Sequence, residues 1–311
     1  METKLVLKRS GAAAEETKLL SFTFVKDAYM PYTTLTASFA ADSGDNYFQV
    51  REALLYVNGK NVHHGLVDSF EFTESFGKKT AVITSRGFTS LLCQNQIEPG
   101  LKTNLSLNSL MDDNYTLPHV THESSSDTSG YIFVKNTSSM WDGIVNLTYK
   151  LNQTYPYIRG TNHVRITQAA QPSEFSYSDD ELIESGFSHN YKRLVSHFNM
   201  ADMSGEYGTY ELEDEYAASK EIVRHKFFEL DRQFLYDPLQ ALEYRRKFAE
   251  RASYRRFCRY SGYNGEDLSD KVSFGIISGS RICGVKIIGN SSGVTTELSV
   301  YHDGFYSSVT D

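Results

Sequence analysis

Hydrophobic and polar residues alternate with a period of two through much of the first 85 residues. This period is typical of strands that bury one face. Turn-forming sequences, among them the hairpin dipeptide Asn58-Gly59, separate the alternating runs. About six short strands in this length predict a small barrel or sandwich, and residues 87–93 predict a short helix that closes it. The alternating positions are Leu20, Phe22, Phe24, Leu35, Ala37, Phe39, Leu66, Asp68, Phe70, Phe72, Ala81 and Ile83.

The pattern changes near residue 99, where Asn, Ser, Thr and Asp become frequent. A strand is predicted over residues 131–134. A helix is predicted from about Ser139 to Asn152, because Ser138 or Ser139 is a favourable N-cap and apolar residues follow at helical spacing. Two further strands are predicted over residues 155–158 and 163–167. We therefore expect a small α/β domain over residues 99–172.

Strand patterns return from about residue 173, and one helix begins at Asp237-Pro238, since Asp is a favourable N-cap and Pro is favoured at the first helical position. That helix is predicted over about residues 237–257. The predicted fold class is mainly β with an α+β insert: a first β-barrel over residues 1–98, the α/β domain, and a second β-barrel with one helix over residues 173–311. The strands predicted in this last part are 182–187, 194–200, 208–212, 222–230, 271–274, 284–288 and 294–301.

Composition narrows the class of protein. The 21 Tyr and 19 Phe residues favour strands, and the net charge of −8 argues against a nucleic-acid-binding surface. No run of apolar residues approaches the length of a transmembrane helix, and the first residues predict no secretory signal. Cys93, Cys258 and Cys283 are widely spaced, which predicts neither a disulfide framework nor a zinc site. These features indicate a protein made in a reducing cytoplasm.

The sequence contains no recognisable catalytic motif, so we expect no enzyme, cofactor or metal site. His119 and His122 lie three residues apart beside Glu123, but they follow a proline in a polar loop and lack a third ligand on a rigid element. His63 and His64 are adjacent in a predicted strand, so they point to opposite faces and cannot chelate one ion together. Surface histidines are the favoured interpretation of that pair.

Residues 237–259 carry seven Lys and Arg against three Asp and Glu, a net charge of +4 in an acidic chain. Such a segment is either a solvated face or a contact with an acidic stretch of a neighbouring copy. Nucleic-acid binding is a third and weaker alternative, because the basic helix is isolated. The candidate interface residues are Arg245, Arg246, Arg251, Arg255 and Arg256, with Glu211, Glu213, Asp214 and Glu215 as the acidic counterpart.

Several short motifs occur in a fixed order along the chain: residues 81–87, 190–196, 222–224, 237–239, 255–256, 260–263, 265–272 and 293–298. In this order they resemble the baseplate hub proteins of phage tails and contractile injection systems, of the Mu-like tail hub or late control protein D type. Each motif is weak alone, but together they extend over nearly the whole chain. Because no spike or cell-wall hydrolase module follows residue 311, we expect any such activity on a separate chain.

The resemblance implies a homotrimer in which each subunit contributes two similar barrels. Three copies would form a ring with pseudo-sixfold symmetry that joins a sixfold tail tube to a threefold central spike. The implied partners are the spike protein, the tube or tube-initiator protein and other baseplate proteins. DNA or another cargo would pass through the lumen without specific binding, and no membrane partner is implied.

The resemblance further implies assembly in the cytoplasm of a bacterial host and a place in a virion tail or a phage-tail-like particle. A contractile phage, a flexible-tailed phage, a bacteriocin and an injection system all remain open. The alternatives are a tube-initiating or distal tail protein of the same kind of particle, or a carbohydrate-binding β-protein that uses exposed aromatic residues.

Overall fold

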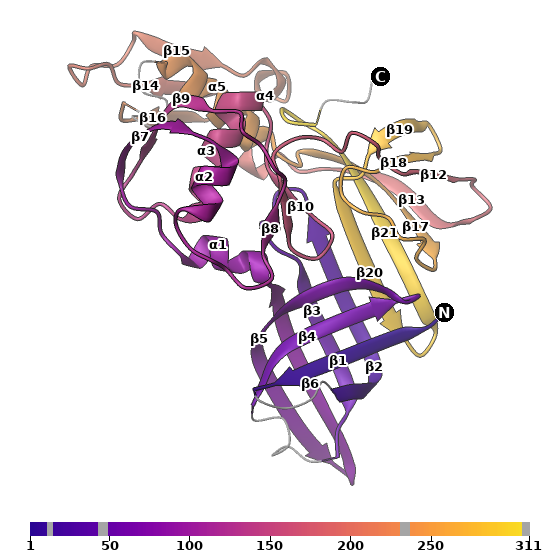
Figure 1. The fold of residues 1–311 in the computed structure, drawn as a ribbon. Helices are drawn as coiled ribbons and strands as arrows, with labels where there is room; N and C mark the ends of the chain where they lie inside the picture. Colours follow the sequence, from indigo (N-terminus) through magenta and orange to yellow (C-terminus); the bar gives the residue numbers. More distant parts are fainter. Residues whose placement is uncertain (11–14, 43–48, 231–236, 307–311) are drawn as a thin grey trace.

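The computed structural model describes residues 1–10, 15–42, 49–230 and 237–306. A closed six-stranded barrel lies at the bottom of Figure 1. Every second side chain from Ala81 to Ser85 is buried, as the alternation predicts. The antiparallel pairing of the first and second strands closes the barrel. Its strands in spatial order are β1 (Thr3–Arg9), β4 (Val50–Val57), β5 (Lys60–Ser75), β6 (Lys78–Gly87), β3 (Thr34–Ala40) and β2 (Glu15–Asp27).

The barrel sheet continues into a second group of strands, because β2 also pairs with β20. The continuation runs through β20 (Gly284–Asn290), β21 (Gly293–His302), β17 (Tyr254–Ser261) and β13 (Leu182–His189). A three-stranded sheet lies beside it and contains β12 (Glu174–Tyr177), β18 (Lys271–Phe274) and β19 (Ile277–Arg281). Buried residues of both groups and of the first barrel form one hydrophobic core. The prediction of a mainly β, barrel-containing fold is therefore confirmed.

Two short helices follow the barrel, η2 (Phe88–Ser90) and α1 (Leu91–Gln94), and confirm the helix predicted there. The next region contains β7 (Gly100–Leu105), α2 (Leu107–Asp112), β8 (Thr121–His122), β9 (Ser129–Val134), α3 (Met140–Asn152), β10 (Tyr157–Arg159) and β11 (His163–Arg165). Helix α3 begins where predicted, because the Ser139 side chain accepts from the Asp142 amide and Asp142 accepts from the Ser139 amide.

Residues between β13 and β17 leave the second strand group and pack against α3. They form η3 (Tyr191–Arg193), β14 (His197–Met200), β15 (Tyr210–Glu213), α4 (Glu215–Ser219), β16 (His225–Phe228) and α5 (Pro238–Glu250). Tyr149 of α3 shares a small core with Phe198, Met200, Ala241 and Leu242. This part lies at the top of Figure 1, beside the α/β region. The domain boundaries at residues 98 and 172 stay predictions.

The helix predicted over residues 237–257 is shorter than expected. It begins at Pro238, with Asp237 as its N-cap, but it ends at Glu250. Ala252 then adopts a left-handed backbone conformation (φ 52°), and β17 starts at Tyr254. Cys258 and Tyr260 alternate into the core from that strand, so tertiary burial decides its conformation. None of the described helices combines the length and the apolar character that a membrane-spanning helix requires.

Candidate functional site

The predicted basic side chains on and after α5 have partners within their own chain. Arg246 binds Glu243, at 2.9 Å between Nε and Oε2, and also binds Glu250. Arg245 lies 4.1 Å from the centre of the Phe228 ring. Arg251 donates to the carbonyl of Phe248, and its guanidinium group lies 3.6 Å from the centre of the Phe248 ring. These cations therefore contact carboxylates, aromatic rings and a carbonyl of the same chain.

Arg255 and Arg256 lie on β17 and not on the predicted helix. Arg255 donates to Glu297 and to the Ser299 hydroxyl, at 2.8 Å for the latter. Arg256 lies 5.3 Å from the centre of the Tyr254 ring and 5.9 Å from that of Phe187. Because Arg255 and Arg256 are adjacent in a strand, they point to opposite faces of the sheet, and the five predicted arginines do not form one surface.

The predicted acidic residues lie on β15 and at the start of α4. Glu211, Glu213 and Glu215 are exposed. Asp214 is only 1% exposed and caps α4, since it accepts from the amides of Tyr216 (3.0 Å) and Ala217 (3.3 Å). Burial raises the pKa of Asp214, and Arg246 opposes that shift. The structure therefore brings the acidic segment close to α5 of the same chain; pairing between copies stays a prediction.

A basic groove lies beside α5 and has a volume of about 620 Å³. Aromatic rings of α5, β14 and β16 line it together with the cations. In the described parts of the chain, no Asp or Glu is among its lining residues. Sequence reasoning missed this groove because most of its cations come from residues 192–226 and only two come from the basic segment. The cations are Lys192, Arg193, Arg224, Lys226, Arg245 and Arg251.

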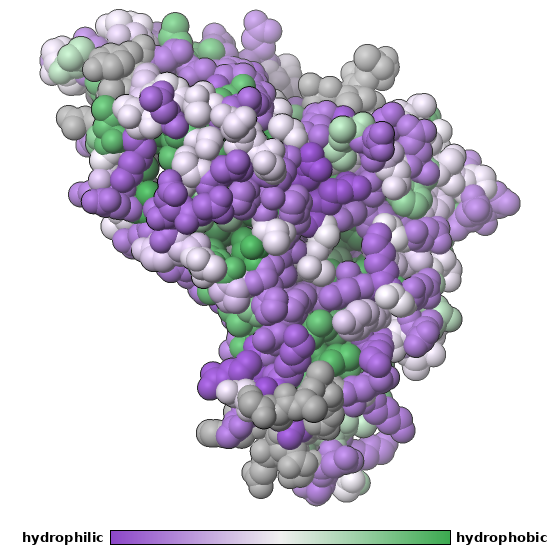
Figure 2. Space-filling model, in the orientation of Figure 1, coloured by the Kyte–Doolittle hydropathy of each residue, from purple (hydrophilic) through white to green (hydrophobic). Residues whose placement is uncertain are grey.

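The hydropathy of the molecular surface is consistent with an interface made by polar contacts. On the face shown in Figure 2, hydrophilic side chains dominate and only small hydrophobic patches lie among them. A contact made on that face would therefore depend on charge and hydrogen bonding more than on apolar area.

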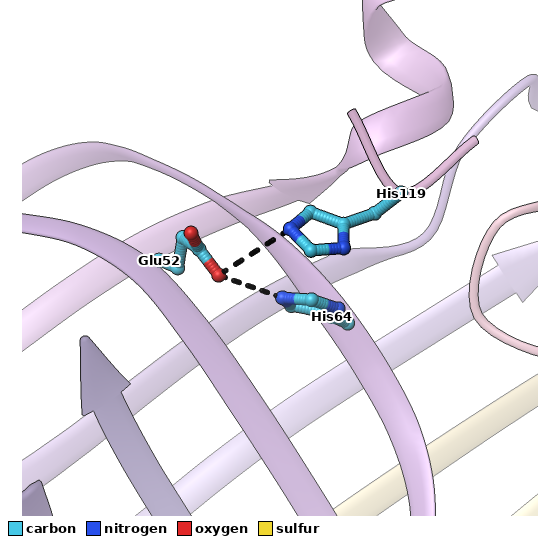
Figure 3. Close-up of side chains that lie close together, drawn as sticks. All are labelled: Glu52, His64 and His119. Atoms are coloured by element: carbon cyan, nitrogen blue, oxygen red, sulfur yellow. Dashed lines mark hydrogen bonds and ion pairs between the residues drawn. The ribbon is translucent and has the colours of Figure 1, made fainter. Parts of the chain in front are cut away.

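A second candidate site joins the first barrel to the α/β region (Figure 3). Glu52 of β4 points toward His64 of β5, with 2.8 Å between Oε2 and Nε2. His119, from the loop before β8, places its Nε2 4.0 Å from the same oxygen. Burial lowers the pKa of His64. Burial alone would raise the pKa of Glu52, but hydrogen bonds from His64 and Lys8 outweigh it and lower that pKa.

The prediction that His63 and His64 both lie at the surface is wrong for His63. That side chain is 0% exposed, and its two ring nitrogens each lie 2.8 Å from a hydroxyl oxygen, of Thr33 and of Ser85. Burial lowers the pKa of His63 to about 3. The two histidines do point to opposite faces of β5, as the period of a strand requires.

His119 and His122 do not act as a pair. The His122 Nε2 lies 3.2 Å from Asp112, whereas His119 packs against His64, with 4.4 Å between ring centres. Sequence reasoning missed Glu52 because its position beside His64 depends on a register shift in the hairpin of β4 and β5. The only local signal was the hairpin dipeptide between those strands.

Comparison with solved structures identifies the fold. The 43 kDa tail protein of prophage MuSo2 from Shewanella oneidensis matches with a TM-score of 0.70 at 13% identity, over 96% of this chain and 98% of that chain. The tail protein from Neisseria meningitidis MC58 matches with a TM-score of 0.71 at 12% identity, over 99% of this chain and 98% of that chain. The chain has the fold of phage tail proteins.

The same tail-protein fold extends to secretion systems. The E. coli c3393 protein, a component of the type VI secretion system, matches with a TM-score of 0.59 at 8% identity, over 98% of this chain and 79% of that chain. A chain of the Francisella PdpA–VgrG complex matches with a TM-score of 0.56 at 9% identity, over 100% of this chain and 59% of that chain. No protein-family model and no curated protein sequence matches the chain.

Proposed function

We propose that this chain is the structural baseplate hub of a phage tail or of a phage-tail-like contractile particle. Three copies would form a ring with pseudo-sixfold symmetry between a sixfold tail tube and a threefold central spike. The observation that carries this proposal is the likeness to two tail proteins over nearly the full length of each chain. The role is structural and includes no catalytic step.

The arrangement of the strands supports the pseudo-sixfold ring. Each chain holds a closed barrel and a second strand group, and the pairing of β2 with β20 joins them in one sheet. Two such units per chain give six units in a trimer. The six units would match the sixfold tail tube on one side of the ring, and the three chains would match the threefold spike on the other. The two units share one hydrophobic core, which supports a role as an adaptor between two stiff assemblies.

Charge complementarity supports a closed ring of copies. A cyclic trimer needs two different surfaces on each subunit, because its contacts are heterologous. The exposed Glu211, Glu213 and Glu215 form one such surface, and the basic groove beside α5 forms the other. We propose that the acidic residues of one copy bind in the groove of the next. Oppositely charged surfaces of this kind set the register and the partner of an interface.

Light scattering on the purified full chain tests this proposal. At low salt we expect three times the mass of one chain, or a monomer that assembles into a complex of three chains plus the spike when it is mixed with the spike protein. Moderate salt should weaken the trimer, because solvent-exposed ion pairs are screened. Six copies would favour a tube-initiating or distal tail protein instead, and a monomer that ignores every tail partner would overturn the hub assignment.

A matched pair of charge-reversal variants tests the interface. Glu211→Lys combined with Glu213→Lys should shift the mass toward the monomer. Glu71→Lys combined with Glu74→Lys changes the charge equally on exposed residues of β5 and should leave the mass unchanged. Equal effects of the two pairs would contradict the proposed contact. Asp214 is a poor probe, because it is buried and caps α4.

A further inference from the structure

We propose that Glu52, His64 and His119 bind one divalent transition-metal ion of the Zn²⁺ class. Each residue offers one donor atom, and these atoms all lie within 4.8 Å of one another. The residues come from β4, from β5 and from the loop before β8, and their side chains converge in Figure 3. This site goes beyond the proposed hub function and differs from the expectation of no metal site, because folding brings together residues that are distant in the sequence.

The distances fit a three-ligand zinc site after small side-chain movements. Tetrahedral coordination, with metal–ligand bonds of about 2.0–2.2 Å, places the donor atoms about 3.3 Å apart. The Oε2 atom of Glu52 lies 2.8 Å from the Nε2 of His64 and 4.0 Å from the Nε2 of His119. The first distance must open and the second must close, each by less than an ångström, and the donor nitrogens of the two imidazoles, which lie within 4.8 Å of each other, must also approach the tetrahedral spacing. Rotation of the loop residue His119 supplies most of that movement.

The donor set selects the class of ion. Two imidazole nitrogens with one carboxylate oxygen suit Zn²⁺ and related transition metals, whereas Ca²⁺ and Mg²⁺ prefer oxygen ligands throughout. The side chains of His64 and Glu52 are 12% and 24% exposed, and that of His119 is 44% exposed. The ring of Phe88 packs against both imidazoles, at 5.0 Å and 4.6 Å between ring centres. The fourth coordination position would therefore face solvent through the His119 side.

The surrounding structure holds two of the three ligands firmly. Glu52 and His64 lie on paired strands of the barrel, and Asn162 donates to the main-chain carbonyl of His64 at 2.9 Å. Lys8 is the competitor, because its ammonium group donates to the same Oε2 atom of Glu52 at 3.1 Å. Lys8 must therefore release this oxygen when the ion binds.

Bound metal would fasten the loop that carries His119 onto the first barrel. Since β8 follows that loop, the ion would link the α/β region to the barrel directly. A ligand that binds only the folded chain raises its stability by mass action. The expected consequence is a higher melting temperature of the full chain when Zn²⁺ is added.

Titration calorimetry with zinc chloride on the full chain, freed of metal by chelator and dialysis, tests the proposal. We expect one ion per chain, and we expect His64→Ala and His119→Ala each to weaken binding by at least about tenfold, since even outer-shell changes cost 10- to 100-fold. His189→Ala removes an exposed histidine of β13 and should leave the affinity unchanged. Lys8→Met should keep or tighten binding, because it removes the competing cation.

Two results would overturn the proposal. The first is the absence of saturable Zn²⁺ binding. The second is binding that survives His119→Ala and is instead lost in His225→Ala. His225 stacks on His197, with 4.1 Å between ring centres, so these two histidines are the alternative site for the ion. His119 is a half-exposed loop residue, so its variant is expected to fold even if His64→Ala does not. Circular dichroism of each variant checks that the fold is intact.

Discussion

Lys26 lies at the point where three segments of the chain meet. It belongs to β2 of the first barrel, and its side chain is 5% exposed. Its ammonium group donates to the carboxylate of Asp267, in the loop before β18, and to the carbonyl of Gly160 at 2.6 Å, in the turn between β10 and β11. The Gly160 amide in turn donates to Asp267 at 2.6 Å. Replacing Lys26 by Met keeps most of its length and removes the charge.

The structure sets the expected magnitude. Removing one partner of a buried ion pair costs about 3–5 kcal/mol, because the other charge stays behind without compensation. Asp267 retains the amides of Gly160 and Leu268 as donors, and its side chain is 14% exposed. Because Asp267 keeps these partners, the cost should lie at the lower end of that range, and Lys26→Met should lower the free energy of unfolding by about 3 kcal/mol. Adding Asp267→Asn removes the charge that is left unpaired. The double variant should therefore lose about 2 kcal/mol less than the sum of the two single variants.

Urea unfolding followed by tryptophan fluorescence measures both values. Trp141 is the one tryptophan of the chain and is buried in α3, so its emission reports on the α/β region that Lys26 holds to the barrel. Lys4→Met is the matched control, because the Lys4–Glu16 pair is exposed and solvent screens such pairs, so its loss should change stability little. The reasoning is refuted if Lys26→Met costs no more than Lys4→Met, or if the double variant costs the sum of the two single ones.

Three further changes have defined outcomes. Gly289→Ala would place its Cβ 2.1 Å from the Phe22 ring, so we expect a loss of about 1–3 kcal/mol in urea unfolding, and an unchanged midpoint would contradict that packing. Ser139→Ala removes the N-cap of α3 and should cost about 1 kcal/mol; no loss in the same assay would rule out the cap as a source of stability. Burial raises the pKa of Glu250 to about 7 from 4.5, against the attraction of Arg246. The stability from that shift is fully present below pH 4.5 and lost as the pH rises through 7, so Glu250→Gln should flatten the fall of the melting temperature between pH 5 and 8; equal slopes would count against it.

The barrel and α3 follow from local patterns. Alternation along β6 places Ala81 and Ile83 inward without knowledge of any distant residue. The capping Ser139 and the apolar spacing after it likewise define α3 within one segment. Such elements are predictable because the features that form them lie within a few turns or strand residues of each other.

The C-terminal end of α5 could not be predicted from the local sequence pattern. Residues after Glu250 continue a helix-compatible pattern, but the chain turns at Ala252 and pairs with β21 and β13. That strand pairing buries Cys258 and Tyr260, whereas a solvent-exposed continuation of the helix would leave them exposed. The basic residues predicted for one helix therefore divide among α5, the turn at Arg251 and β17.

The histidine cluster depends on a single irregularity in a hairpin. Val57 pairs with Lys60 and Tyr56 with Asn61, which is the register that the Asn58-Gly59 turn predicts. The register then shifts by one residue, so Glu52 pairs with Leu66 and shares a face of the sheet with His64. Without that bulge, Glu52 and His64 would lie on opposite faces. A bulge leaves no reliable local signal, so the sequence alone could not predict this cluster.

End-on electron-microscopy class averages of the purified ring, alone or with the spike protein, test the hub assignment most directly. The account predicts a particle of three chains that shows six similar densities around a lumen, two from each chain. Six chains in one ring, or three chains with only three equivalent densities, would contradict it.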